Sequence, residues 1–380
     1  MSVQPTPPLS LYIHIPWCVK KCPYCDFNSH TSNSIDEEKY LNALMADLDA
    51  ELAITNNRPI KSIFFGGGTP SIFSPDTIRR IIEGTNNRLI FDKNIEITME
   101  ANPGTFEQKN FSEFKTIGIN RLSIGIQSFN DNHLKSIGRI HDSQQALSAI
   151  NTAQESGFDN INLDLMFGLP EQTIEQAIND IEIACQQNVP HISHYQLTIE
   201  ANTFFHKHPP ITPDMETLWE MQNQCHDVLN KNNFLQYEVS AFSKSDKQCI
   251  HNLNYWNFGD YIGIGAGAHG KITDTVTGKT SRRWKHRQPE GYMSSAINNP
   301  LSGQAEIKNN ELIFEFLLNA LRLKKGFSYE IFEDNTGLSR KKLIDVCQTV
   351  DAELLLISDS GICCSNKGYH FLNDVLEQFV

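Results

Sequence analysis

The chain has 380 residues, of which 39% are hydrophobic and 20% are charged, so it is long enough for one large domain and a smaller one. Asp and Glu outnumber Lys and Arg by 45 to 32, which gives a net charge of −13. This balance argues against nucleic acid as the main partner, because binding to phosphate needs a basic surface. The apolar runs are far shorter than the roughly 18 residues of a membrane span.

The N-terminus is polar and proline-rich, and we expect residues 1–9 to form a loose tail. It lacks the basic end and apolar stretch of a secretory signal, so we expect a cytoplasmic protein with reduced cysteines. The nine cysteines are an odd number, which argues against a disulfide framework. Six of them are scattered and are expected to be small buried side chains: Cys185, Cys225, Cys249, Cys347, Cys363 and Cys364.

Three cysteines follow the first predicted strand, Leu11–Ile15, at a C-x3-C-x2-C spacing: Cys18, Cys22 and Cys25. Thiolates are ligands that suit zinc or iron–sulfur clusters. Structural zinc usually takes four protein ligands, and no second cysteine pair follows at such a spacing. Three thiolates suit a [4Fe–4S] cluster whose fourth iron stays open for a small molecule. A zinc site or simply buried thiols are the alternative.

A strand–helix alternation follows, in which a helix over Asp36–Leu52 precedes a buried strand at Lys61–Phe65. Gly66, Gly67, Gly68 and Thr69 come directly after that strand. Glycines at a strand end let the backbone approach a ligand, although three glycines alone are often only a tight turn. Four further strands are predicted, each preceded by a helix (75–89, 106–116, 143–155 and 173–186): Ile95–Glu100, Arg121–Gln127, Ile161–Met166 and His194–Ile199.

Six such β/α units between residues 10 and 232 predict a parallel sheet with right-handed crossovers. Six rather than eight units favour a partial, open, TIM-like (β/α)6 barrel. Polar side chains recur near the ends of its strands, where barrel enzymes carry their ligand loops: Glu100, Gln127 and Asp164, with Arg139 in the loop and helix that follow the fourth strand. Such groups are costly in apolar strands unless they are paired, so internal salt bridges are the alternative to ligand binding.

Residues 233–304 have a different texture, with a strand near Tyr237–Ser240, the motif His251-Asn-Leu-Asn-Tyr255-Trp256 and a glycine-rich loop that carries His269. A histidine beside aromatic rings suits a flat aromatic ligand, with imidazole as an axial iron ligand. From chemistry alone, a core histidine bonded to the backbone is the better interpretation of His251. His269 is interpreted as structural or as a secondary candidate.

Residues 305–380 predict three helices, a hairpin over residues 353–364 and a last helix to Val380. This order is typical of a small winged-helix-like domain. From residue 301 onward there are eight Lys and Arg against twelve Asp and Glu, a net charge of −4. That charge argues against DNA binding and favours a lid or a partner-docking role.

The stretch LYIHIPWCVKKCPYCDFNSH, with Tyr24 just before the third cysteine, resembles the radical S-adenosylmethionine (SAM) superfamily. Within it, the chain is similar to relatives of oxygen-independent coproporphyrinogen III oxidase (HemN), and most similar to the HemW branch, described as heme chaperones. The resemblance implies a [4Fe–4S] cluster on Cys18, Cys22 and Cys25. It places the glycines and Thr69 against the methionine part of SAM. It also implies further SAM contacts: Tyr12, Tyr24, Glu100, Gln127, Arg139 and Asp164.

The resemblance leaves two functions from different classes. In one, an injected electron cleaves SAM to a 5′-deoxyadenosyl radical, which starts the oxidative decarboxylation of coproporphyrinogen III. In the other, the protein keeps the cluster but carries heme, bound through His251, to acceptors such as respiratory enzymes. The carrier needs an electron donor for its cluster and leaves peripheral membrane association open.

Two departures from the HemN pattern favour the carrier. HemN proteins have a further cysteine two residues after the third, where this chain has Phe27. They also have a longer extension before the first strand, thought to cover the substrate. A radical enzyme acting on another substrate stays open, because residues that bind SAM do not specify the second substrate.

Overall fold

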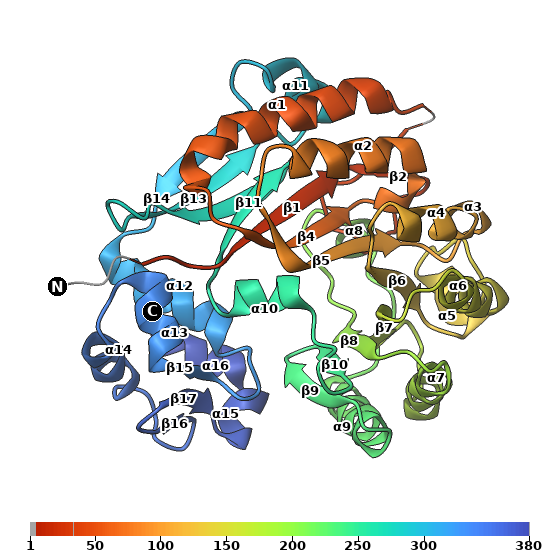
Figure 1. Ribbon diagram of the computed structural model, residues 1–380. Coiled ribbons are helices and arrows are strands. Elements are labelled where there is room, and N and C mark those ends of the chain that lie inside the picture. The colour runs from red at the N-terminus through yellow and green to blue at the C-terminus, as the bar shows by residue number, and fades with distance from the viewer. Residues whose placement is uncertain (1–4, 33, 380) are drawn as a thin grey trace.

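The computed structural model describes residues 5–32 and 34–379. Within them, the main feature is a sheet of twelve strands in the order β14-β13-β12-β11-β1-β4-β5-β6-β7-β8-β10-β9 (Figure 1). The six strands predicted for the barrel are parallel neighbours in chain order. Their bounds are β1 Leu9–Ile15, β4 Ile60–Gly67, β5 Phe91–Ala101, β6 Arg121–Gln127, β7 Ile161–Phe167 and β8 His191–Gln196. The predicted α/β fold is confirmed.

Residues 235–306 extend this sheet at both edges. On one side β11 (Asp260–Ile264) is parallel to β1, followed by antiparallel β12 (His269–Thr273), β13 (Thr280–Lys285) and β14 (Leu301–Glu306). On the other side lie antiparallel β10 (Ala241–Ser243) and β9 (Leu235–Glu238). Among the described residues no ladder joins β14 to β9, so the sheet is open.

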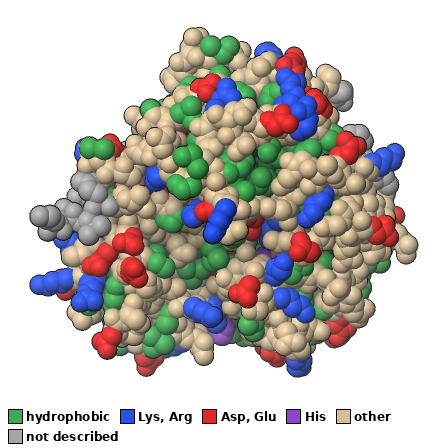
Figure 2. Space-filling model, in the orientation of Figure 1, with side chains coloured by type: hydrophobic (Ala, Val, Ile, Leu, Met, Phe, Trp, Pro, Cys, Tyr) green, Lys and Arg blue, Asp and Glu red, His purple; other side chains and the backbone are tan. Residues whose placement is uncertain are grey.

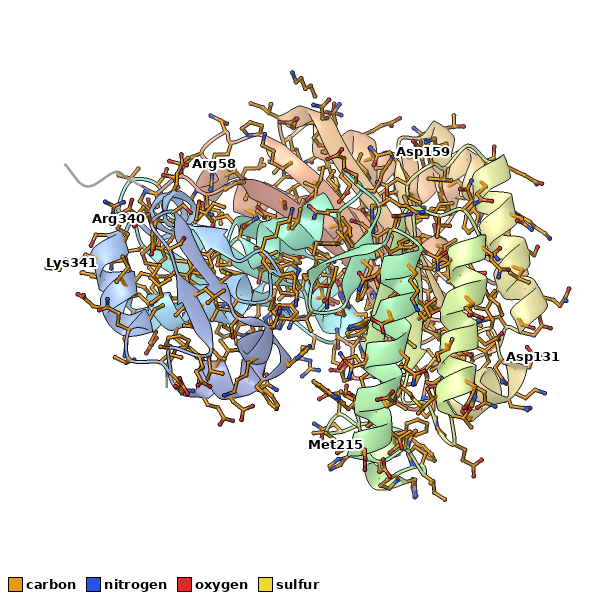
Figure 3. The ribbon with its side chains drawn as sticks, turned by 90° about the horizontal axis from the view of Figure 1, so that it is seen from below. Arg58, Asp131, Asp159, Met215, Arg340 and Lys341 are labelled. Carbon is orange, nitrogen blue, oxygen red and sulfur yellow. The ribbon has the colours of Figure 1, made fainter. Side chains whose placement is uncertain are left out.

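The helices begin at sequence signals that the chain supplies locally. Ser74 accepts a hydrogen bond from Thr77 N–H at the start of α2, and reciprocal capping boxes begin α6 and α7. Helices α7 and α9 lie side by side, with Met215 at the start of α9 (Figure 3). The bounds are α1 Glu37–Thr55, η1 Pro70–Ile72, α2 Pro75–Asn86, α3 Thr105–Gln108, α4 Phe111–Thr116, α5 Asp131–Ser136, α6 Ser143–Glu155, α7 Ile174–Gln186, α8 Phe204–Lys207, α9 Met215–Lys231, α10 Ile250–Trp256 and α11 Pro289–Ser295.

Some element bounds differ from those predicted. The helix expected over 106–116 is two short helices, α3 and α4, because a turn from Asn110 N–H to the Glu107 carbonyl separates them. The sixth strand begins three residues earlier than predicted, because His191 pairs with Asn162 of β7 directly after Pro190. The first part of the predicted glycine-rich loop is strand β11, since Ile262 and Ile264 are buried there.

A second core lies in the C-terminal part, drawn in blue in Figure 1. Strand β17 pairs antiparallel with β15 and β16, so helices and a hairpin form the predicted winged-helix-like arrangement. The predicted last helix is interrupted at Phe371. The bounds are α12 Asn309–Ala320, β15 Phe327–Ser328, α13 Tyr329–Thr336, α14 Arg340–Cys347, β16 Leu355–Ile357, β17 Gly361–Cys364, α15 Asn366–His370 and α16 Leu372–Glu377.

The domain boundaries drawn from the sequence stay a prediction. Residues 1–4 of the expected tail, and Val380, lie outside the described residues. Within the rest of the tail, Arg58 Nη1 donates to the Pro7 carbonyl at 2.8 Å, and Asp260 N–H donates to the Pro8 carbonyl at 2.8 Å. Among the helices that the structure describes, none has the length and apolar character needed to cross a bilayer.

Candidate functional site

The three predicted cysteine ligands lie on one loop between β1 and α1. Short strands β2 (Trp17–Cys18) and β3 (His30–Thr31) pair parallel and close this loop at its base. Inside it, Lys21 Nζ donates to the carbonyls of Phe27 at 3.0 Å and Ser29 at 3.2 Å. All three thiols are free and half-buried. The loop is thus held by strand pairing at its base and by the Lys21 side chain inside it, and its thiols face a common cavity of about 300 Å³.

The opposite wall of this thiol cavity comes from the carboxyl ends of the parallel strands. Those ends meet at one edge of the sheet, where α/β proteins of this type place their ligands. The structure therefore brings together most of the site residues predicted from the sequence. The predicted residues that line the thiol cavity are Cys18, Cys22, Tyr24, Cys25, Gly67, Gly68, Thr69, Glu100, Gln127, Arg139 and Asp164.

Two predicted residues, Tyr12 and Gly66, do not line the thiol cavity. The ring of Tyr12 faces a second cavity, and its hydroxyl bonds to Nδ1 of His14 at 2.9 Å. Gly66 lies behind the cavity wall, where an added Cβ would be 3.0 Å from the ring of Phe64. Their predicted contacts with SAM therefore stay predictions.

Gly67 is required by the geometry of the loop. Its φ of +111° lies in the left-handed region, and a Cβ there would be 2.4 Å from the imidazole of His14. Its N–H donates to Oε2 of Glu100 at 3.1 Å. The glycine thus lets backbone and imidazole approach closely while a backbone donor holds a buried carboxyl.

The carboxyls of this cavity are held in an environment that disfavours their charge. Burial raises the pKa of Glu100 to about 8, and the nearby Asp164 adds to the effect. Burial also raises the pKa of Asp164, although Asn162 and Ser123 donate hydrogen bonds to it. A cationic ligand would relieve both penalties, because it favours the ionised carboxylates.

Several cavity residues were not predicted from the sequence. Asn102 donates to Oγ1 of Thr69 at 2.9 Å and accepts from Nη2 of Arg139 at 2.6 Å. Tyr195 donates to Oε1 of Gln127 at 2.8 Å. Asn102 directly follows β5, so its position at a strand end was the available signal. Tyr195 gave none, because the alternation of a strand does not say which face a ligand occupies.

The three thiols of the loop lie where a group shared by a cysteine triad would bind. Among the described residues, no three His, Cys, Asp or Glu side chains converge closely enough to hold one metal ion. Cys18, Cys22 and Cys25 nonetheless surround one cavity, and thiolates are ligands that suit an iron–sulfur cluster. Burial raises the pKa of Cys18 and of Cys25, and bound iron would favour the thiolate. The residues fit an iron–sulfur cluster.

A larger cavity of about 590 Å³ opens beside the first. Phe27, Gly67 and Glu100 line both, so the two cavities meet at these residues. Aromatic side chains from β1, α10, the turn after it and β11 form much of its wall: Tyr12, Tyr255, Trp256, Phe258 and Tyr261. Polar side chains complete the wall of this cavity, and its volume is that of a typical ligand site.

His251 is placed outside both cavities by the structure. It lies on α10, the helix between the sheet and the C-terminal part (Figure 1), and its side chain is 1% exposed. Nδ1 bonds to Oγ of Ser62 at 2.8 Å, and Nε2 bonds to the hydroxyl of Tyr255 at 2.8 Å. Burial lowers the pKa of His251 to about 3, so the ring is neutral. Both of its nitrogens are therefore occupied.

Comparison with known proteins agrees with this geometry. A model described as the radical SAM superfamily matches residues 12–184, and one described as the HemN C-terminal domain matches residues 307–371. The solved structure of coproporphyrinogen III oxidase (HemN) from Escherichia coli has a TM-score of 0.84 at 21% identity, and the match covers all of this chain and 91% of that one. Fold, thiol loop and strand-end site define a radical SAM protein.

Sequence comparison then identifies the family within the radical SAM proteins. The chain is 46% identical to the heme chaperone HemW of Haemophilus influenzae and 44% identical to that of Escherichia coli. Each match covers 98% of this chain and 98% of the relative. The protein belongs to the HemW family. Membership of the radical SAM superfamily implies a [4Fe–4S] cluster and SAM as cofactors.

Proposed function

We propose that this protein is a cytoplasmic heme chaperone, which binds heme and delivers it to acceptor proteins such as respiratory enzymes. It holds a [4Fe–4S] cluster on Cys18, Cys22 and Cys25, takes SAM in the adjoining cavity and receives electrons from a separate donor. Near-full-length identity of 44–46% to proteins named as heme chaperones supports this assignment.

The observation that carries the proposal is the junction of the two cavities. The thiol cavity, with its strand-end polar groups, opens at Phe27, Gly67 and Glu100 onto the larger, aromatic-walled cavity. Aromatic rings offer a large apolar packing surface, which suits a flat macrocycle. Phe27 also stands where HemN proteins have a further cysteine, and its side chain is 59% exposed at the junction. This departure supports a carrier rather than a coproporphyrinogen oxidase.

The residues of the thiol cavity have separate tasks in this proposal. When bound, the cluster and SAM together supply one-electron chemistry at a sulfonium carbon, and the protein supplies position and exclusion of water. Glu100 and Asp164 offer carboxylates to a ligand that carries positive charge. Arg139 holds neighbouring groups of the thiol cavity in place, since its Nη2 donates to Asn102 and to the Gly125 carbonyl, both at 2.6 Å. Its Nη1 lies 3.8 Å from Sγ of Cys22.

The resemblance assigns the heme iron to His251. Such ligation requires that Nε2 exchange the Tyr255 hydroxyl for iron, or that Nδ1 exchange Ser62. Both bonds lie within a closely packed cluster in which the rings of His251 and Phe64 are 5.0 Å apart. The resemblance of the motif supports heme binding in this region. Ligation of the iron by His251 requires that one of these two hydrogen bonds be broken.

The proposal is tested with anaerobically reconstituted protein. Before heme is added, wild type should show cluster absorbance at roughly 400 nm, as iron–thiolate centres do. It should then bind one heme per chain. Replacing any one of Cys18, Cys22 and Cys25 with Ala should remove the cluster absorbance. Cys225→Ala is the matched control, because this buried thiol lies on α9, outside both cavities.

Two results would contradict the proposal. If iron, sulfide and absorbance all survive the triple Cys→Ala substitution, these cysteines do not hold a cluster. If the wild-type protein takes up no heme in either the reconstituted or the cluster-free form, it is not a heme carrier.

A further inference from the structure

A groove lies on the side of the cysteine loop that faces away from the strand ends. Its volume is about 520 Å³, and Cys22 and Cys25 line both this groove and the thiol cavity. The strand-end residues of the thiol cavity do not line the groove, so the cysteine loop separates the two hollows. The groove therefore gives access to the thiols from outside while the thiol cavity stays free for a small ligand.

Three segments build the walls of this groove and hold one another in place. The N–H of Phe205, on α8, donates to the carbonyl of Pro23 in the cysteine loop at 3.0 Å. Gly138, in the turn after α5, has a φ of +73°, and a Cβ there would be 2.7 Å from Cδ of Pro23. Helix α8 and this turn thus pack closely on the cysteine loop, and the groove is a preformed part of the fold.

Large apolar side chains are exposed around this groove. Phe204 of α8 lines it, and its side chain is 59% exposed. Val19 and Ile140 are 66% and 62% exposed and line a small cavity that shares Lys20 and Cys22 with the groove. Gathered apolar side chains that stay exposed are typical of interaction sites. Here they come from three different segments and surround one thiol.

The charge of the groove is opposite to that of the chain. Lys20 and Lys21 are exposed and line it, and among the described residues no Asp or Glu does. Asp26 is exposed on the same loop but lies outside the lining of the groove. The whole chain carries a net charge of −13, so this basic rim is a local exception. A basic rim around apolar side chains complements a partner with an acidic surface.

We propose that this groove is the docking surface for a small acidic protein that carries single electrons and delivers them to the group held by Cys18, Cys22 and Cys25. One electron leaves the reduced carrier and enters the cluster; no bond forms or breaks and no proton moves. Redox encounters of this kind bury less than about 1,200 Å² in total, so a patch of a few side chains suffices. The inference rests on the proposed function and names the partner class and the surface for its electron donor.

The test follows reduction of the cluster by stopped-flow absorbance in anaerobically reconstituted protein. One reductant is a reduced plant-type [2Fe–2S] ferredoxin, a small acidic protein, and the other is reduced methyl viologen, which needs no docking. Lys20→Glu should slow reduction by ferredoxin about tenfold or more, because it removes the electrostatic attraction, and should not slow reduction by methyl viologen. Added salt should slow the ferredoxin reaction of wild type much more than that of Lys20→Glu.

Matched variants separate the apolar contact from the charge. Phe204→Ala should weaken binding of oxidised ferredoxin, measured by calorimetry on reconstituted protein, and should leave the salt dependence of the reduction rate unchanged. Lys341→Glu makes the same change of charge at an exposed lysine on the outer side of the C-terminal part (Figure 3) and should have no effect on either reductant. The cluster absorbance of each variant before reduction reports that it is folded and loaded.

The outcomes distinguish this inference from the function beneath it. If wild type forms its cluster, and Lys20→Glu and Phe204→Ala leave both the rate and the binding of ferredoxin unchanged, the docking surface is overturned while the carrier function stands. If these substitutions instead abolish self-association of the protein, or binding of a heme-free respiratory acceptor, with the ferredoxin rate unchanged, the groove belongs to that partner and the inference is wrong. If wild type forms no cluster, the proposed function fails and the inference fails with it.

Discussion

Glu100 is the residue at which the two cavities of this protein meet. The groups around its carboxyl are Asp164 from β7, the phenols of Tyr12 and Tyr255, and the N–H of Gly67. Only the N–H favours the charged form. The sequence predicted Glu100 as a site residue because a charged side chain ends a buried strand. It could not predict the pKa, which depends on neighbours brought in by other strands.

The raised pKa of Glu100 should appear in the stability of the ligand-free protein. Its folded-state pKa of about 8 exceeds the ordinary value of 4.5, so the folded protein retains a proton that the unfolded chain releases between these pH values. The free energy of unfolding should therefore fall as pH rises through this window, by at most about 1.4 kcal/mol per pH unit from this group. Urea titrations at several pH values measure it.

Glu100→Gln should remove this contribution, so the difference in stability between variant and wild type should grow from pH 5 to pH 8. Glu113→Gln, which alters an exposed carboxyl on α4, is the control and should show no such trend. Parallel pH profiles for wild type and Glu100→Gln would mean that Glu100 ionises normally.

At the scale of elements, most strands and helices were predicted from the strand–helix pattern of the sequence. Buried apolar strands and capped helices are local properties, so the six parallel strands and most helices could be located from the chain alone. The partner of β1 on its other side could not, because β11 lies some 250 residues further along the chain. The same limit applied to His251: its motif indicated a helix and rings, and only the packing of α10 on β4 showed that its nitrogens are occupied.

The loop after β4 makes a prediction with a built-in control. Gly67 and Gly118 have the same φ of +111°, but a Cβ on Gly67 would meet His14 whereas one on Gly118 meets nothing within 4 Å. Gly118→Ala should cost only about 1–2 kcal/mol from left-handed backbone strain. Gly67→Ala should cost more and should also abolish SAM binding, measured by anaerobic calorimetry. Equal effects of the two substitutions on stability and on SAM binding would refute the close approach.

At the scale of the whole molecule, the charge is dispersed and the C-terminal core reaches the wall of the larger cavity. Acidic and basic side chains are interspersed over the face in Figure 2, without a patch of one sign. Arg340 and Lys341 lie on the outer side of the C-terminal part, away from the sheet (Figure 3).

Phe258 belongs to the C-terminal core and also lines the larger cavity. Packing of the C-terminal helices thus helps to shape that wall.

Because the C-terminal core helps to shape the wall of the larger cavity, we expect a distant substitution in that core to weaken heme binding. Phe316 of α12 is fully buried and its ring lies 5.8 Å from that of Phe258. Phe316→Ala should cost about 3–5 kcal/mol of stability and raise the heme dissociation constant, measured by hemin titration below the melting transition. Leu318→Ala on the same helix, where the side chain is 41% exposed, should change neither. Unaltered heme affinity in folded Phe316→Ala would show that the two cores act independently.

The central claim is that this chain delivers heme and does not decarboxylate a porphyrinogen. The most direct measurement gives reconstituted protein, SAM and reductant to two anaerobic samples, one with heme-loaded protein and a heme-free respiratory acceptor, the other with coproporphyrinogen III. Heme alone with the acceptor sets the uncatalysed rate. The account predicts faster transfer of heme to the acceptor in the first sample and no protoporphyrinogen IX in the second. Formation of protoporphyrinogen IX, with no transfer above the rate of free heme, would contradict it.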